Sequence, residues 1–276
     1  MPEFDWAGAS GRAWLAGADR LEAQLAPVTD VLLDRAALAP GESVLDVGCG
    51  RGSTTRAAAA AVGTGRVIGL DIADELVDAA RGLDPDGRCE WVVADAQAAA
   101  LDGLGVDVVL SRFGVMFFRD PLLAFVNLAG AVRPGGRLCV AAWQNRDRSP
   151  FQAVPIAAAT AAAAEMGLQP PVGPSDGGAF SLGDAGRVKD LLTMAGWSDV
   201  GHEPLTVTLH AGGPGASPAE AAALFGAIGP FGEWLRAIDS GSAGRIVSAM
   251  ETALIPFHGP TGVVIDGAIA IVTARR

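Results

Sequence analysis

The sequence contains no tyrosine and only three cysteines among its 276 residues. The absence of tyrosine removes phenol hydroxyls from the groups that could take part in catalysis. Cys49, Cys89 and Cys139 are odd in number and widely separated, which fits neither a disulfide framework nor the close spacing of a zinc site. We therefore expect a protein of the reducing cytoplasm that holds no metal ion.

Positive charge is also scarce, since 20 lysines and arginines stand against 31 acidic residues and the net charge is −11. Such a chain lacks the positive field that attracts a phosphate backbone, so we expect no nucleic acid partner. The uncharged stretch Ser149–Ala164 is mostly alanine and contains Pro150 and Pro155, so we predict a soluble helix there and no membrane partner. The stretch Met1–Asp5 is acidic and lacks the apolar core of a secretory signal.

After residue 40, short apolar segments alternate with longer amphipathic ones. Nearly continuous apolar strands separated by helices are typical of a parallel sheet covered on both faces. We therefore predict an α/β fold with a doubly wound, mostly parallel sheet. The expected strands are 43–47, 66–70, 90–94, 106–111 and 137–142, and the expected helices between them are 53–61, 74–81 and 122–132.

Two segments rich in glycine, proline and alanine interrupt this pattern after Trp143, on either side of a sixth predicted strand at 199–209. We expect them to form a substrate lid, with helices at 219–228 and 232–246 in the second segment. A closing strand is predicted at 263–274. The predicted parts are an N-terminal helical segment (1–40), a cofactor-binding α/β core (41–143, 181–211 and 262–276) and the lid (144–180 and 212–261).

A glycine-rich loop follows the first predicted strand, with Gly48, Gly50 and Gly52 in alternation. Doubly wound sheets bind ligands outside the carboxyl ends of their strands, and the loop lies at such an end. Glycines let the backbone turn tightly and approach a ligand closely, and the helix that starts near Ser53 points free N–H groups at it. By itself the loop could equally serve a nicotinamide dinucleotide.

Four other residues bear on the choice of ligand. A dinucleotide loop needs glycine or alanine where this chain has Ser53, and Asp46 inside the strand repels a pyrophosphate but suits a positive ammonium group. Asp71, at the end of the second strand, can accept hydrogen bonds from both hydroxyls of a ribose. Asp95, just past the third strand, can accept one from an adenine amino group. The set fits a ligand with an amine, a ribose and an adenine.

These segments resemble the motifs of class I S-adenosylmethionine-dependent methyltransferases. The matching stretches are Val44–Gly52, Ile68–Ile72, Ala94–Ala96, Asp107–Arg112 and Val132–Leu138. The stretch Ser111–Phe118 resembles a bacterial branch related to the methyltransferases of ubiquinone and menaquinone biosynthesis. The resemblance implies a Rossmann-like sheet of seven strands with the last antiparallel, and S-adenosylmethionine as the cofactor.

The resemblance also implies which residues bind this cofactor. The three glycines of the loop would contact its methionyl and ribose parts, and Ser111 would lie beside the methionyl group. Asp71 would hold the ribose, and Ile72 would pack on the adenine. Asp95 and Ala96 would fix the amino edge of the adenine.

Two further candidates come from the residues themselves. Trp14 could close over the cofactor, although a tryptophan is more often a packing residue. A sulfonium methyl is already activated, so alignment matters most and a general base is optional. His258, in a predicted loop before the closing strand, is the candidate base because histidine titrates near neutrality. The potential walls of the lid pocket are Phe151, Met166, Phe180, Leu224, Phe225, Phe231 and Trp234.

Together these features predict methyl transfer from S-adenosylmethionine to a small, largely apolar acceptor, and they are compatible with a homodimer. Two alternatives stay open. One is a nicotinamide-dependent oxidoreductase, which Ser53 and Asp46 disfavour. The other is a methyltransferase-fold protein that binds S-adenosylmethionine but works as a binding module or as a non-methylating catalyst such as a cyclase.

Overall fold

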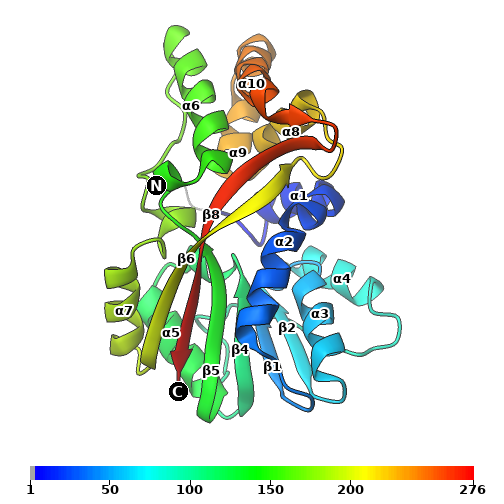
Figure 1. The fold of residues 1–276 in the computed structure, drawn as a ribbon, viewed down its shortest axis with the longest axis vertical. Helices are drawn as coiled ribbons and strands as arrows, with labels where there is room; N and C mark the ends of the chain where they lie inside the picture. The colour runs from blue at the N-terminus through cyan, green and yellow to red at the C-terminus, as the bar shows by residue number, and fades with distance from the viewer. Residues whose placement is uncertain (1–3) are drawn as a thin grey trace. The chain divides into compact units, whose positions relative to one another are not determined.

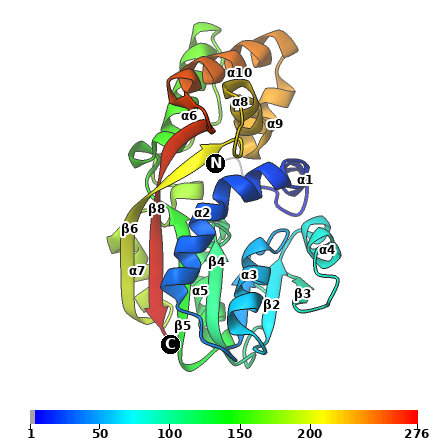
Figure 2. The same cartoon turned by 45° about the vertical axis from the view of Figure 1, so that its right-hand side comes forward.

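The structure is a computed structural model that describes residues 4–276, and the chain divides into two compact units. One, here called the sheet unit, consists of Val28–Gln144, Ala179–Leu205 and Ile269–Arg276. The other, here called the helical unit, consists of residues 4–27, Asn145–Gly178 and Thr206–Ala268. Figures 1 and 2 show the helices and strands of both units, most of them labelled.

The strands pair into one sheet. They are β1 (Val44–Val47), β2 (Val67–Asp71), β3 (Glu90–Val93), β4 (Val106–Arg112), β5 (Val132–Trp143), β6 (Ser198–Ala211), β7 (His258–Gly259) and β8 (Gly262–Arg275). Their order is β3-β2-β1-β4-β5-β8-β6, and the short β7 pairs with β8 off this path. The pairs from β3 to β5 are parallel, whereas β8 is antiparallel to β5. The predicted doubly wound, mostly parallel sheet is confirmed.

Helices cover both faces of the sheet. In the sheet unit they are the C-terminal part of α2 (Ala18–Ala36), α3 (Ser53–Val62), α4 (Asp74–Gly82), α5 (Pro121–Ala131) and α7 (Ala185–Met194). Helices α2, α3 and α4 lie on one face, and α5 and α7 on the other (Figures 1 and 2). Because the central strands are covered twice, Leu45, Leu110 and Leu138 are fully buried. Each such side chain stabilises the fold by roughly 1.5–3 kcal/mol.

The helical unit contains α1 (Ala9–Ala16), the start of α2, α6 (Pro150–Glu165), α8 (Pro218–Ala227), α9 (Gly229–Ala237) and α10 (Ser240–Leu254). The helix expected at 149–164 is therefore present as α6. The Phe151 ring on α6 contacts the Phe225 ring on α8, with the ring centroids 4.9 Å apart. Within residues 4–276, no helix has the length and apolar character needed to span a membrane.

One predicted helix is wrong. The segment 232–246 belongs to two helices, α9 and α10, because Asp239 has extended backbone angles, with φ −64° and ψ 147°. Its carboxylate accepts a hydrogen bond from the Ser242 N–H at 2.9 Å and so caps the start of α10. A capping aspartate satisfies an amide at the helix start that has no partner inside the helix, which favours a new start there over a continuous helix.

The two units also differ from the three predicted parts. The segment 1–40, of which residues 1–3 lie outside the described residues, is divided inside α2, between Pro27 and Val28. Strands β6 and β8 are shared as well, since residues 206–211 and 262–268 belong to the helical unit. The two units have boundaries after Gln144 and Gly178, and the division into an N-terminal segment, a cofactor-binding core and a lid stays a prediction.

Candidate functional site

The loop after β1 is folded by three glycines in the left-handed region, with φ +69° at Gly48, +54° at Gly50 and +76° at Gly52. A methyl group built on Gly48 would lie 2.7 Å from the Cα atom of Gly114. One built on Gly52 would lie 2.1 Å from the ring of Trp91. A methyl group on Gly50 would meet no atom of the described residues within 4 Å. The loop is therefore packed at both ends and open in its middle.

Asp71 ends β2 and ties the loop to that strand. Its Oδ2 accepts a hydrogen bond from the Gly50 N–H at 2.8 Å, and its Oδ1 accepts one from the Ala73 N–H at 2.9 Å. The residue is 8% exposed, and burial raises the pKa of its carboxyl group while the backbone hydrogen bonds oppose that shift. A carboxylate oxygen has two acceptor positions, so Asp71 could bind two hydroxyl groups while it holds the loop.

Ser111 connects the end of β4 to the end of β1. Its hydroxyl donates to the Val47 carbonyl at 2.7 Å and accepts from the N–H groups of Gly114 at 3.1 Å and Val115 at 3.3 Å. The side chain is fully buried. The hydroxyl therefore has no donor left for a ligand. Its observed task is to hold the turn after β4 against the glycine loop.

Asp46 lies inside β1 with 1% exposure, and its Oδ2 accepts a hydrogen bond from the Thr55 hydroxyl at 2.6 Å. This bond joins the strand to the first turn of α3. Burial, together with the neighbouring Asp46 and Asp71 carboxylates, raises the pKa of the Cys49 thiol well above its ordinary value. At neutral pH Cys49 is therefore a neutral thiol, which is a poor nucleophile.

The ends of β2 and β3 lie side by side, because the Ala94 N–H donates to the Asp71 carbonyl at 2.9 Å. Directly after Asp71, the side chain of Ile72 is 42% exposed. Covering apolar surface is favourable, so Ile72 offers a surface on which a planar ring could pack.

Asp95 and Ala96 follow β3 in a segment fixed by hydrogen bonds. The Oδ1 atom of Asp95 accepts from the Gln97 N–H at 2.9 Å. The Ala96 carbonyl accepts from the side-chain amide of Asn127 at 2.7 Å. Asp95 is half-buried and Ala96 is buried, at the same carboxyl edge of the sheet as Asp71.

Residues 45–140 match the family model described as a methyltransferase domain. That stretch contains the glycine loop, the three carboxylates and Ser111. The chain carries a class I, S-adenosylmethionine-dependent methyltransferase domain.

The chain has relatives in several bacteria. The chain is 38% identical over 111 residues to the 2-methyl-6-phytyl-1,4-hydroquinone methyltransferase of Synechocystis sp., across 40% of this chain and 35% of that protein. It is 31% identical over 187 residues to the nocamycin O-methyltransferase of Saccharothrix syringae, across 63% of this chain and 65% of that protein. The crystal structure of the YcgJ protein of Bacillus subtilis shares the fold, with a TM-score of 0.58 at 12% identity over 90% of this chain and 97% of that chain.

The matches to the curated relatives cover only part of each protein. It spans less than two thirds of the length of both named methyltransferases. It spans 32% of an uncharacterised relative from Streptomyces fradiae and 48% of one from Mycobacterium tuberculosis.

The residues of the methyltransferase domain fit S-adenosylmethionine. Its methionyl part carries an ammonium group, which suits the negative charge of the buried Asp46. The ribose hydroxyls suit Asp71, and the open space at Gly50 lets a ligand approach the backbone. The adenine has an apolar surface in Ile72 and a carboxylate in Asp95. These groups lie at the carboxyl ends of β1, β2 and β3, which are neighbours in the sheet.

Sequence reasoning missed two aromatic residues that shape this edge of the methyltransferase domain. Trp91 on β3 packs against the glycine loop, and the only signal for it is its register opposite Gly69 on β2. Phe113, just after β4, has φ +66° and stacks on Trp143 with ring centroids 4.1 Å apart. A phenylalanine in the left-handed region is strained and persists only where the surroundings hold it.

Trp14 and His258 belong to the helical unit. Trp14 packs edge-to-face on Trp6, with ring centroids 5.8 Å apart. His258 is exposed in β7, where its backbone pairs with Val263. The predicted cofactor role of Trp14 and the catalytic role of His258 stay predictions. Among the described residues, no three histidine, cysteine or acidic side chains form a group that could hold a metal ion.

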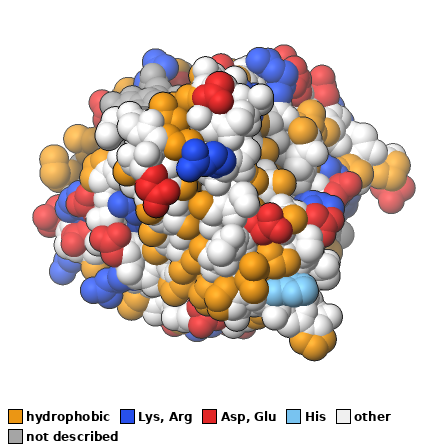
Figure 3. Space-filling view, turned by 90° about the horizontal axis from the view of Figure 1, so that it is seen from above, with side chains coloured by type: hydrophobic (Ala, Val, Ile, Leu, Met, Phe, Trp, Pro, Cys, Tyr) orange, Lys and Arg blue, Asp and Glu red, His pale blue; other side chains and the backbone are white. Residues whose placement is uncertain are grey.

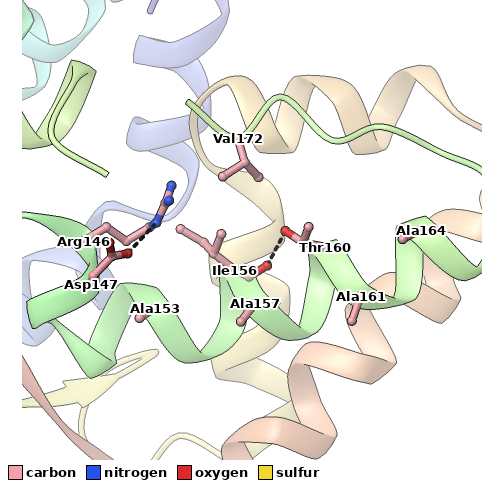
Figure 4. A pocket seen from close by; sticks show the side chains of 9 residues that line it. All are labelled: Arg146, Asp147, Ala153, Ile156, Ala157, Thr160, Ala161, Ala164 and Val172. Atoms are coloured by element: carbon pink, nitrogen blue, oxygen red, sulfur yellow. Dashed lines mark hydrogen bonds and ion pairs between the residues drawn. The ribbon is translucent and has the colours of Figure 1, made fainter. Parts of the chain in front are cut away.

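A groove with a volume of approximately 520 Å³ lies along α6 in the helical unit (Figure 4). Its polar groups are partly used within the unit, since Arg146 donates to the Gly173 carbonyl at 3.0 Å and Thr160 to the Ile156 carbonyl at 2.7 Å. The rest of the lining is mainly alkyl. The lining residues are Arg146, Asp147, Ala153, Ile156, Ala157, Thr160, Ala161, Ala164 and Val172.

The aromatic residues predicted to line the lid pocket are not in that groove. Phe151 packs on Phe225, and Phe231 packs on Trp234 with ring centroids 5.5 Å apart. Phe180 belongs to the sheet unit and is buried there. Four of the seven predicted wall residues are thus paired with one another in the helical unit.

Proposed function

We propose that the chain binds S-adenosylmethionine at the carboxyl edge of β1, β2 and β3 and catalyses transfer of its methyl group to a small, largely apolar acceptor. The form of the glycine loop carries the proposal. Gly50 has a backbone conformation that favours glycine, Asp71 holds its N–H at 2.8 Å, and the space in front of it is open. A loop shaped in advance lowers the ordering cost of binding.

The protein's part in the reaction is to bind and orient. S-adenosylmethionine supplies a methyl group that its sulfonium centre has already activated. Fixing two reactants in line can be equivalent to an effective concentration of about 10⁵–10⁸ M. The Ser111 hydroxyl and the packed Gly48–Gly114 contact give the loop the rigidity that such alignment needs.

Several features support a small, apolar acceptor. With a net charge of −11, the chain is unsuited to tracking a phosphate backbone. On the face shown in Figure 3, basic side chains are scattered among acidic and apolar ones. The mainly alkyl lining of the α6 groove suits an apolar ligand. Two relatives are named for methylating a phytyl-hydroquinone and nocamycin, which supports a small-molecule acceptor here.

A thermal-shift measurement tests cofactor binding. A ligand at a hundred times its Kd stabilises the folded state by about 2.7 kcal/mol. We expect S-adenosylmethionine and S-adenosylhomocysteine to raise the Tm and NAD to leave it unchanged. A rise in Tm with NAD alone would contradict the proposal and favour a nicotinamide-dependent oxidoreductase.

Turnover tests the rest of the proposal. The purified chain, incubated with S-adenosylmethionine, should release S-adenosylhomocysteine with at least one member of a panel of quinols, phenols and amines. A Gly50→Ala variant, whose new methyl group fills the open space of the loop, is the control and should release none. Tight cofactor binding without turnover on any acceptor would favour a binding module or a non-methylating catalyst.

A further inference from the structure

The ring of Trp91 occupies space that two glycines leave free. Trp91 on β3 is the register partner of Gly69 on β2. A methyl group on Gly69 would lie 2.7 Å from the Trp91 ring, and one on Gly52 would lie 2.1 Å from it. The ring therefore rests on the backbone of β2 and, at the same time, against the third glycine of the cofactor loop.

Hydrogen bonds fix the position of this ring. The Trp91 Nε1–H donates to Oδ2 of Asp84 at 3.0 Å. The same carboxylate accepts from the N–H groups of Cys89 at 2.9 Å and Arg88 at 3.1 Å. The Trp91 carbonyl accepts from the Arg81 guanidinium at 3.0 Å. Because Asp84 is itself anchored to the backbone before β3, the indole has little freedom to turn.

Arg56 on α3 holds the same end of the loop. Its guanidinium Nη1 donates to the Arg51 carbonyl at 2.7 Å, and a methyl group on Gly52 would lie 3.2 Å from the same nitrogen. The Arg51–Gly52 end of the loop is therefore held by both a guanidinium and the Trp91 ring.

We propose that Trp91 is a positioning residue for the cofactor loop. Its ring sets the place of the Arg51–Gly52 turn, and through that turn the place of the open Gly50 position. In this role Trp91 acts through the loop. The inference rests on the proposed function, since it assumes that the loop binds S-adenosylmethionine.

Substitution of Trp91 tests this role through cofactor affinity. Displacing a binding element by about 1 Å can cost up to about a hundredfold in activity, and we expect Trp91→Ala to weaken S-adenosylhomocysteine binding about tenfold in calorimetry. Trp91→Phe, which keeps most of the ring volume, should stay within about twofold of wild type. In turnover assays the KM for S-adenosylmethionine should rise in Trp91→Ala while the KM for the acceptor stays constant. A loss of stability alone would not raise the KM for S-adenosylmethionine while the KM for the acceptor stays constant.

A double-mutant cycle separates positioning from general packing, because contacting residues show coupled rather than additive effects. Gly52→Ala should weaken S-adenosylhomocysteine binding more in the wild-type background than in the Trp91→Ala background, since the ring is the obstacle to the new methyl group. Gly69→Ala is the matched control. It meets the same ring but lies in β2, so its cycle with Trp91→Ala should show coupling in the free energy of unfolding and little in affinity.

Three outcomes decide whether Trp91 positions the cofactor loop. Weaker binding in Trp91→Ala with the coupling described supports the inference. Wild-type affinity in Trp91→Ala, or an equal cost of Gly52→Ala in both backgrounds, overturns it and leaves the proposed function intact. Wild-type protein that does not bind S-adenosylhomocysteine overturns both.

Discussion

The sheet unit and the helical unit use small residues in different ways. In the sheet unit, Gly48, Gly50 and Gly52 each have a positive φ and a distinct neighbour or space, so each position specifies glycine. In the helical unit, alanines of α6 line a groove that several residue types could form. A site built from backbone conformation leaves a readable motif in the sequence, whereas a site built from side-chain volume does not.

The largest expected effect comes from Gly48→Ala. We expect a loss of about 2–5 kcal/mol in the free energy of unfolding, from about 1–2 kcal/mol of left-handed strain and about 1–3 kcal/mol of overpacking against Gly114. The matched variant Gly50→Ala meets no neighbour and should lose only the strain, about 1–2 kcal/mol, while it abolishes cofactor binding. Urea denaturation and calorimetry with S-adenosylhomocysteine measure the two quantities. Equal stability losses would show that the loop is not packed as described.

Phe151→Ala tests whether the helical unit contributes to stability without contributing to cofactor binding. Phe151 is 3% exposed and packs on Phe225, so its truncation should cost about 3 kcal/mol of stability. Phe151→Leu, which keeps more volume, should cost less than about 1.5 kcal/mol. We expect neither variant to change the affinity for S-adenosylhomocysteine more than twofold, because the proposed contacts all come from the sheet unit. A tenfold change in this affinity would show that the helical unit also contributes to cofactor binding.

Asp71→Asn sharpens the description of the cofactor site. We expect about a tenfold loss of S-adenosylhomocysteine affinity at pH 7, because hydrogen bonds to a charged acceptor are worth about 1.5–3 kcal/mol. Asn is a smaller change than Ala, since Asn keeps one of the two oxygens that accept from the Gly50 and Ala73 N–H groups, whereas Ala would remove both. An unchanged affinity would show that Asp71 serves only the loop.

The pH dependence follows from the raised pKa of Asp71. A carboxyl group with a raised pKa takes up its proton at a higher pH than an ordinary aspartate, which titrates near about 4. As pH falls through that pKa, the folded state binds the proton more tightly than the unfolded state, so Asp71 adds to stability. Cofactor affinity should fall over the same range, because the protonated group loses acceptor capacity. When binding and unfolding are followed from pH 7 to pH 4, wild type should therefore gain stability relative to Asp71→Asn, and the difference in affinity between the two proteins should shrink.

Most of the sheet could be predicted because its parallel strands β1 to β4 are short, mainly apolar and bounded by turns. The strand–loop–strand order also placed Asp46, Asp71 and Asp95 at one edge, since parallel strands bring their carboxyl ends together. The helix predicted at 232–246 failed because its apolar spacing continues across Asp239, and the capping role of that residue depends on a local backbone change. Periodicity alone does not reveal such a change.

The roles of Ser111 and Trp91 could not be predicted for a different reason. The sequence places Ser111 at the end of a strand, but its three hydrogen bonds depend on how the next turn folds back. Trp91 gains its role from Gly69 and Gly52, which lie 22 and 39 positions away in the chain. Both roles depend on contacts between distant segments, and such contacts have no local pattern.

The packing of one indole against two glycines has a consequence for the evolution of this family. Among homologues, positions 52, 69 and 91 should change together, because a larger residue at either glycine position requires a smaller one where this chain has Trp91. Chains that keep both glycines should keep a large aromatic residue there. A pair of alanines should coincide with a short side chain, and this covariation would mark the cofactor loop even in relatives whose glycine motif is degenerate.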